Sequence, residues 1–397
     1  MSSPTILRLA DVMRISLERL EPHAFPDRAF NYVGLEHIEG HTGRLHSRGS
    51  TLGVELDSTK NVFHPGQILY GKLRPYLNKV HLAAVDGICS TDILVLSCEE
   101  SRLVPAFAAY YLRSAYTLEA VRNRLVGANL PRVGRGDFLG LEIPVFPLTD
   151  QRRIVRMLDE AEDLRRLRDL ADERTMLTEA ALFLEMFGSP SVNPRDWPIG
   201  CVGDWFDMSR GGVKCGPFGS ALKKAEYVES GIPVWGIPNV LPNRFVEAGS
   251  LFITRAKFAQ LQSYAVEPGD LLISRAGTVG RMCVARPEVR ESIIGTNLIR
   301  LTLDGTMILP EFFSTLLTHF ASEVGHLRAN TDESSYSFMS TTVLKSLRIY
   351  RPPLELQQRF VGRVAEISAL EAMQAASRKR LDDLFESLLH RAFQGEL

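Results

Sequence analysis

Basic and amide side chains gather in a turn that occurs twice in this chain. After HPGQILYG the turn carries Lys72, Arg74, Tyr76, Asn78 and Lys79. After EPGDLLIS it carries Arg275, Thr278 and Arg281. A Lys or Arg beside a tight turn can bind a phosphate group while an amide or aromatic side chain reaches a base edge. A solvated hairpin is the alternative, but the basic residue at the matched positions Lys72 and Arg275 favours a function.

The densest glycine cluster lies in GGVKCGPFGSALKKAEYVESGIPVWGIPNV, which begins at Gly211. A phosphate-binding P-loop needs Gly-Lys followed by Ser or Thr, whereas Gly216 is followed by Pro217 and Phe218, so nucleotide binding is disfavoured. A loop with an exposed backbone and basic neighbours suits a polyanion better. Its polar neighbours are Lys214, Ser220, Lys223 and Lys224. A purely structural loop is the alternative.

Three further groups of residues have side chains that could contact a ligand. In LEHIEGHTGRLHSR the glycines predict strand and turn, so the three histidines are expected to be surface or DNA-facing groups near Arg44 rather than a metal site. At and just after the end of the glycine cluster, candidates for contact with base edges are Asn239, Asn243 and Arg244. Tyr336 and Phe338 fit either a recognition loop or the entry to a strand.

The apolar pattern divides the chain into two strand-rich regions, each followed by a long helix. Short apolar runs predict strands as far as Leu148, with one helix at about Pro105 to Arg122. From Thr149 apolar residues recur every three or four positions, with no Pro or Gly before Gly188. At about 1.5 Å per residue, this helix of nearly forty residues would be roughly 55 to 60 Å long. A second strand-rich region with a helix near Pro310 to His326 leads to another long helix from Leu354.

The two halves repeat the same order of segments, roughly 200 residues apart. CSTDILVL corresponds to IGTNLIRL, VPAFAAYYL to LPEFFSTLL, and FPLTDQRRIV to PPLELQQRFV. Such a repeat indicates duplication of a whole unit of strand-rich domain plus helix. The two helices carry a stripe typical of a coiled coil and are natural partners. If they pair antiparallel, the strand-rich domains lie at opposite ends of a rod.

Composition narrows the possible functions. The chain has 397 residues, 45% of them hydrophobic and 23% charged, with no run long enough for a membrane span, which predicts a cytoplasmic protein. Five scattered cysteines form no CxxC pair and indicate reduced thiols. The formal net charge of −1 means that a nucleic-acid partner requires local basic patches or help from another subunit. Motifs for an amino-methyltransferase, a nuclease metal site or a nucleophile elbow are absent, so catalysis by this chain is not expected.

Taken together, these segments resemble a known family over nearly the full length. The strings GPFGSALKKAEYVESGIPVWGIPNV, YVGLEHIEG, PGQILYGKLRP and PGDLLISRAGTVG, with PLTDQRRIVRMLDEAEDL and PLELQQRFVGRVAEI opening the long helices, are similar to those of specificity (S) subunits of type I restriction-modification systems. Each string is moderately specific. In this order, twice, they are highly specific.

The resemblance implies an α+β protein with an internal pseudo-two-fold repeat. It implies target-recognition domains at 1–148 and 189–352 and spacer helices at 149–188 and 353–397, which form an antiparallel coiled coil. It further implies that two methyltransferase (M) subunits, and through them restriction (R) subunits, dock on this non-catalytic subunit. S-adenosylmethionine, ATP and Mg²⁺ would then be bound by those partners and no cofactor by this chain.

Two readings follow. In the first, the chain binds double-stranded DNA with a split, asymmetric target whose unread gap is on the order of 5 to 8 base pairs, because half-sites on one face lie about 34 to 36 Å apart. In the second, it is a coiled-coil adaptor that binds two proteins and no DNA. Salt-dependent binding of a specific duplex separates the two.

Overall fold

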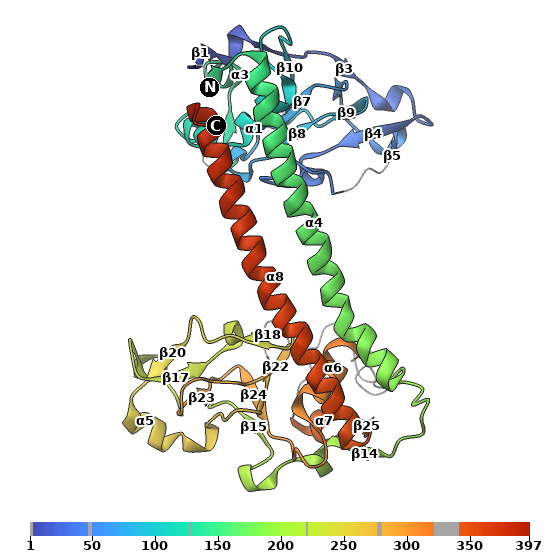
Figure 1. Cartoon of the computed structure of the whole chain (residues 1–397), viewed down its shortest axis with the longest axis vertical. Helices are drawn as coiled ribbons and strands as arrows, with labels where there is room; N and C mark the ends of the chain where they lie inside the picture. Colours follow the sequence, from blue (N-terminus) through green and yellow to red (C-terminus); the bar gives the residue numbers. More distant parts are fainter. Residues whose placement is uncertain (1–2, 47–49, 128, 220, 276–279, 321–340) are drawn as a thin grey trace. The chain divides into compact units, whose positions relative to one another are not determined.

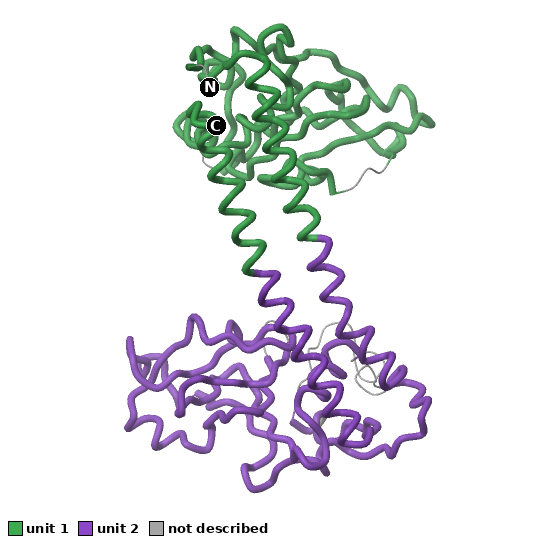
Figure 2. The backbone as a smooth tube through the Cα atoms, in the orientation of Figure 1, with its two compact units in different colours: residues 1–169, 376–397 green, residues 170–375 purple. Residues whose placement is uncertain are grey.

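The computed structural model describes residues 3–46, 50–127, 129–219, 221–275, 280–320 and 341–397. These residues form two compact units, one of residues 1–169 with 376–397 and the other of residues 170–375 (Figure 2). We refer to them as unit 1 and unit 2. Each combines strands, short helices and parts of two long helices, so the fold is α+β (Figure 1).

Unit 1 contains two main sheets. The first has the order β2-β10-β7-β8, formed by Met13–Ile15, Ile93–Cys98, Ile68–Gly71 and Val80–Leu82, with all neighbours antiparallel. The second has the order β3-β6-β9-β4-β5, formed by Arg19–Leu20, Lys60–Phe63, Gly87–Cys89, Ala29–Val33 and Ser50–Leu52. Within it β4 and β9 are parallel. Two short pairs complete the unit: β1 (Thr5–Arg8) with β13 (Glu142–Val145), and β11 (Leu125–Val126) with β12 (Arg132–Val133).

Unit 2 repeats this plan. One sheet has the order β15-β24-β21-β22, formed by Val213–Cys215, Leu298–Leu301, Leu271–Ser274 and Met282–Val284. The other has the order β16-β20-β17-β23, formed by Tyr227–Val228, Leu251–Ile253, Ile232–Trp235 and Ile293–Ile294. Like the second sheet of unit 1, it contains a parallel pair, here β17 with β23. β14 (Ile199–Cys201) pairs with β25 (Arg348–Tyr350), and β18 (Val240–Leu241) pairs with β19 (Arg244–Phe245). The helices are α5 (Arg255–Gln260), α6 (Pro310–Phe320) and α7 (Thr341–Ser346).

The first sheets of the two units have the same strand order, and each second sheet contains one parallel pair, which confirms the repeat inferred from sequence. Both Pro-Gly turns place glycine in the left-handed region, with φ of 83° at Gly66 and 96° at Gly269, as a type II turn requires. In each turn the side chain of the residue after the glycine accepts a hydrogen bond from the backbone N–H of the residue three positions earlier. His64 N donates to Gln67 Oε1 and Glu267 N to Asp270 Oδ2, both at 2.8 Å.

One predicted helix proved to be two. The segment expected as a single helix from Pro105 to Arg122 forms α1 (Pro105–Arg113) and α2 (Ala115–Arg122). Ser114 separates them in an extended conformation, with ψ of 157°, and its Oγ accepts a hydrogen bond from Thr117 N. Serine favours such a cap because its hydroxyl replaces a missing helical acceptor. The second expected helix begins at Pro310 as α6, and residues 321–340, which include Tyr336 and Phe338, lie outside the described residues.

The two long helices are α4 (Leu148–Phe187) and α8 (Leu354–Gln394). In unit 2 the ring of Phe183 packs against Phe360 with centroids 5.7 Å apart, and Gln374 Nε2 donates to Thr175 Oγ1 at 2.9 Å. Since the order of the contacts reverses along the chain, the helices run antiparallel there, as predicted. In unit 1, Arg165 Nε donates to Asp382 Oδ1 at 2.7 Å.

Each unit has a main core between its first sheet and the helices. In unit 1 the fully buried Phe107 packs against Phe146 and Phe393. In unit 2 four fully buried phenylalanines from α4, α6 and α8 pack together: Phe183, Phe187, Phe312 and Phe360. All five cysteines are free thiols, and burial raises the pKa of Cys89, Cys98 and Cys283 to about 12. Among the described residues, no helix is both long and apolar enough to cross a bilayer.

Candidate nucleic-acid interface

Sheet topology brings the predicted loops to one edge in each unit. β2 and β7 are both antiparallel to β10, so they run in the same direction and the segments after them leave from the same edge. The same holds for β15 and β21 on either side of β24. In unit 1 this edge carries the turn 72–79, and in unit 2 it carries the glycine-rich loop from Gly216 together with Arg275. We call each of these edges the loop edge of its unit.

The turn 72–79 presents some of its predicted residues and uses others internally. Arg74 and Asn78 both adopt left-handed conformations, with φ of 48° and 51°. Arg74 and Tyr76 are exposed. By contrast Asn78 is 3% exposed and donates to the Arg113 carbonyl at 2.8 Å, while Lys79 Nζ donates to the Leu35 carbonyl at 2.6 Å. Asn78 therefore fixes the turn, and its amide is not available to a base in this conformation.

Lys72 lies in a group of positive charges that are distant in sequence. Burial lowers its pKa, Asp92 opposes this effect, and the neighbouring charges of Arg135, Arg132 and Arg19 lower it further. Backbone pairing explains the proximity, since Val133 N donates to the Lys72 carbonyl at 3.2 Å and Arg74 N to the Pro131 carbonyl at 2.8 Å. Of these three arginines, Arg132 is the only one that forms an ion pair with Asp92 in the described part of the chain. Its Nε lies 3.4 Å from Asp92 Oδ1. Concentrated positive charge of this kind favours binding of phosphate.

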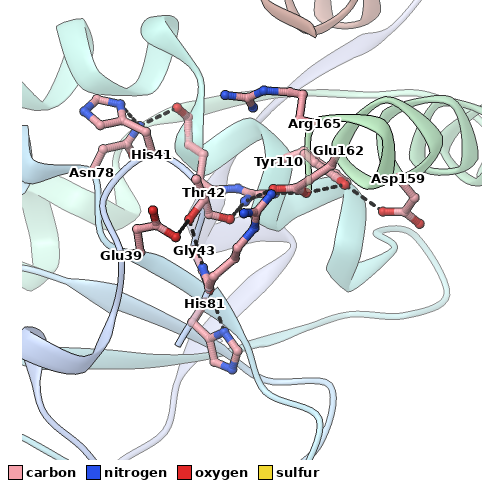
Figure 3. Close-up of polar contacts among 12 residues, drawn as sticks. Glu39, His41, Thr42, Gly43, Asn78, His81, Tyr110, Asp159, Glu162 and Arg165 are labelled. Carbon is pink, nitrogen blue, oxygen red and sulfur yellow. Dashed lines mark hydrogen bonds and ion pairs between the residues drawn. The ribbon is translucent and has the colours of Figure 1, made fainter. Parts of the chain in front are cut away.

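The loop 39–44 of unit 1 is fastened to α4 by a polar network (Figure 3). The Arg113 guanidinium donates to the Thr42 carbonyl and to both carboxylate oxygens of Glu162, the latter at 3.2 and 3.4 Å. Tyr110 Oη lies 2.6 Å from Asp159 Oδ1 and 2.9 Å from Glu162 Oε2, so its single hydroxyl proton lies between two carboxylate acceptors. Burial, followed by these carboxylates, raises the pKa of Tyr110. Through Arg113 the network ties the loop to Glu162 of α4 within unit 1.

Arg44, a predicted phosphate ligand on this loop, instead pairs with α4. Its Nη1 lies 3.2 Å from Asp169 Oδ2, so part of its charge is already neutralised. The neighbouring His41 adopts a left-handed conformation and bonds Asn78, and His37 Nδ1 accepts from Gly34 N. No group of three or more metal-ligating side chains occurs among the described residues.

At the loop edge of unit 2, close packing of backbone shapes the glycine-rich loop. A Cβ on Gly216 would lie 1.9 Å from the Gly295 carbonyl oxygen, so only glycine fits there. Two residues later Phe218 is 54% exposed, and the Arg275 guanidinium lies 4.6 Å from its ring centroid. Lys223 and Lys224 are exposed, and Arg281 is half-buried. Lys214 Nζ lies 4.9 Å from the Tyr264 ring, and Ser220 and Thr278 are outside the described residues.

Two asparagines of unit 2 that were predicted to contact base edges, Asn239 and Asn243, make hydrogen bonds within the unit instead. Asn239 is 1% exposed; its Oδ1 accepts from Gly236 N at 2.8 Å and its Nδ2 donates to the carbonyls of Val246 and Ala248. Asn243, in a left-handed turn, donates to Glu179 at 2.8 Å and accepts from Ser314 and Thr318. Both amides are committed to bonds within the unit.

Arg244 lines a cavity of about 690 Å³ in unit 2. Two arginines, Arg244 and Arg286, face it together with four carboxylates, those of Glu179, Glu247, Glu288 and Glu311. Because acidic side chains outnumber basic ones, the cavity is a poor place for phosphate. Arg244, predicted to contact a base edge, lies among these carboxylates in the cavity.

Sequence reasoning missed Arg19, Arg132, Arg135 and Phe218. In PRVGRGD, Arg132 and Arg135 lie 60 and 63 positions after Lys72 in the chain, and backbone pairing of residues 131–133 with the turn brings them close to it. Phe218 had a local signal, since a large apolar residue between Pro217 and Gly219 has little room to be buried.

Comparison with known proteins finds similar chains among the specificity subunits of type I restriction enzymes. No family model matches it. The specificity subunit of the type I restriction enzyme EcoDI from Escherichia coli is 29% identical over 154 residues, 39% of this chain and 34% of that protein. The specificity subunit of StySPI from Salmonella potsdam is 23% identical over 319 residues, 75% of this chain and 66% of that protein. The chain thus spans about a third and about two thirds of the lengths of these two relatives.

A solved structure has the same fold. It comes from work on complex assembly and conformational transition of the type I R-M system, and it aligns with a TM-score of 0.65 at 24% identity, over 100% of this chain and 99% of its own. The likeness includes both strand-rich regions and both long helices.

Proposed function

We propose that this chain, which belongs to the family of type I restriction enzyme specificity subunits, is the DNA-recognition subunit of such a complex and has no catalytic role of its own. The observation that carries the proposal is the loop edge of each unit. In both units a basic residue follows the same strand of an equivalent sheet, Lys72 after β7 and Arg275 after β21. A protein with two such edges can read two separate half-sites.

The two loop edges differ in chemistry, which supports an asymmetric target. Unit 1 offers a cluster of cations around Lys72 with the exposed Arg74 and Tyr76. Unit 2 offers Phe218, Arg275 and exposed lysines. Different side chains meet different base edges, so the half-sites should have different sequences. Residues 1–148 and 189–352 would be the target-recognition domains, and helices 149–188 and 353–397 would set an unread gap on the order of 5 to 8 base pairs.

The formal net charge of −1 fits a subunit that binds DNA together with partners. A protein that neutralises many phosphates alone usually carries a strong positive charge. We infer that two methyltransferase subunits, with restriction subunits attached to them, share the phosphate contacts. S-adenosylmethionine, ATP and Mg²⁺ belong to the chemistry of those partners.

The test is salt-dependent binding of duplex DNA by the chain in complex with its methyltransferase partners. The specific duplex, identified by methylome sequencing, should bind far more tightly than a scrambled one, and log K should fall linearly with log salt. Lys72→Ala should reduce the slope by about 1 for both duplexes, because a phosphate contact carries no sequence information. Arg8→Ala, on the separate β1·β13 pair, is the matched control.

A chain that only joins two proteins would behave differently. It would show neither a sequence preference nor a dependence of binding on salt, and Lys72→Ala would have no effect on DNA. A palindromic or continuous methylated sequence would contradict the asymmetric, split target while leaving DNA recognition intact.

A further inference from the structure

Phe218 is an apolar side chain in an unusual position. More than half of its surface is exposed, although Gly216, two residues earlier, is packed tightly against the backbone of Gly295. Gly219 adopts a left-handed conformation, with φ of 45°, and Ala221 N donates to the Phe218 carbonyl at 2.8 Å. The loop therefore presents the ring outward at the loop edge of unit 2.

Arg275 fixes the orientation of this ring. Its guanidinium carbon lies 4.6 Å from the ring centroid, a distance at which a cation and an aromatic face attract each other. The guanidinium Nη1 is buried and has no hydrogen-bond partner within the described part of the chain. Its packing partner is thus the Phe218 ring, one face of which is covered.

We propose that Phe218, held by Arg275, contacts the C5-methyl group of a thymine in the half-site read by unit 2. The inference rests on the proposed function and deepens it by naming the base. In the major groove, thymine presents a methyl group that an apolar side chain can contact. The ring carries no charge and no hydrogen-bond donor, so it cannot bind a phosphate. Insertion between two base pairs is disfavoured because it needs both ring faces, and Arg275 occupies one.

Arg275 is a positioning residue in this arrangement. Its charge is retained in Arg275→Lys, but the planar guanidinium that stacks on the ring is lost. If Arg275 acts through Phe218, both Arg275→Ala and Arg275→Lys should weaken discrimination for the methyl group. If it acts only as a phosphate ligand, Arg275→Lys should retain that discrimination.

The experiment replaces each thymine of the specific duplex with deoxyuridine, one at a time, and measures the dissociation constant of the complete complex with its methyltransferase subunits. Deoxyuridine lacks only the methyl group. At one thymine the wild-type complex should lose about fourfold in affinity, the value expected for one buried methyl group. In Phe218→Ala the same replacement should have no effect. Leu251→Ala, which removes another exposed apolar side chain of unit 2, should keep the fourfold loss.

Three results would overturn the inference. One is an equal effect of deoxyuridine in wild type and Phe218→Ala; another is a target in which the half-site read by unit 2 contains no A·T pair. The third is kinking of the DNA that disappears in Phe218→Ala, since it would assign the ring to insertion between bases. A wild-type complex that does not distinguish the specific duplex from a scrambled one would instead refute the proposed function itself.

Discussion

Gln151 and Gln357 make the same hydrogen bonds at the beginning of the two long helices. Gln151 Oε1 accepts from Val104 N at 2.8 Å, and its Nε2 donates to the carbonyls of Phe146 and Arg102 at 2.7 and 2.8 Å. Gln357 Oε1 accepts from Leu309 N at 2.8 Å, and its Nε2 donates to the Pro352 carbonyl at 2.8 Å. Both side chains are fully buried. Each ties its long helix to the segment that leads into α1 or α6.

Replacing Gln357 should destabilise unit 2. Gln357→Ala leaves Leu309 N and the Pro352 carbonyl buried without partners, which should cost about 1 to 3 kcal/mol in the free energy of unfolding. The three tryptophans, Trp197, Trp205 and Trp235, all belong to unit 2, so their fluorescence during urea unfolding reports on it. The adjacent, exposed Gln358→Ala should unfold like the wild type. Equal midpoints for both variants would show that the bonds contribute little.

Replacing Asp270 should strongly destabilise unit 2. It is fully buried, accepts two hydrogen bonds from Arg210 at 2.9 Å each, and accepts another from Thr302 at 2.6 Å. Asp270→Asn removes the charge that balances Arg210 and should cost about 3 to 5 kcal/mol. The matched position of unit 1 is the neutral Gln67, whose amide donates to Ser97 at 2.8 Å. Gln67→Ala should therefore cost only about 1 kcal/mol. Equal losses of stability would contradict this account.

Removing Arg113 should loosen the loop 39–44. The arginine joins the Thr42 carbonyl to Glu162 on α4, and its side chain is only 10% exposed. In Arg113→Ala the amide hydrogens of His41 and Gly43 should exchange with solvent about tenfold faster or more. Arg44→Ala, which breaks the more exposed pair with Asp169, should have a smaller effect because such pairs contribute at most about 1 kcal/mol. Unchanged exchange in Arg113→Ala would show that the loop is held by other contacts.

His64 should titrate above the usual histidine range. Hydrogen bonds to Asp86 at 2.7 Å and to Glu18 at 3.1 Å raise its pKa. Because the folded pKa is raised, its stabilising contribution is complete below the unfolded value of about 6.5 and is lost as pH rises through the folded value. The NMR titration midpoint of His64 should fall in Asp86→Asn. A midpoint that does not move would contradict the assigned cause.

The repeated framework could be predicted from sequence because its signals are local. Short apolar runs, Pro-Gly turns and a three-and-four spacing of apolar residues depend on neighbouring residues, so the two strand-rich regions and both long helices were predicted correctly. The break at Ser114 was missed because serine also occurs inside helices, and its capping role depends on a backbone conformation that spacing does not reveal.

The candidate interface was harder to predict because it depends on contacts between distant segments. Arg132 approaches Lys72 only through a strand pairing, and whether an asparagine faces solvent depends on the fold around it. Asn78 and Asn243 did carry a signal. Asparagine tolerates the left-handed conformation found at both positions, and that property favours a turn residue over a ligand-binding one.

The parallel strand pair in each unit has a consequence for how the chain folds. Tyr32 pairs with Ile88, and Val234 pairs with Ile293, so each pairing closes a loop of more than fifty residues. Hairpins such as β7·β8 and β21·β22 join neighbouring segments and can form early, whereas these two pairings must wait for distant strands to meet. The slow steps of folding should therefore be two similar events, one in each half of the chain, each completing its own sheet.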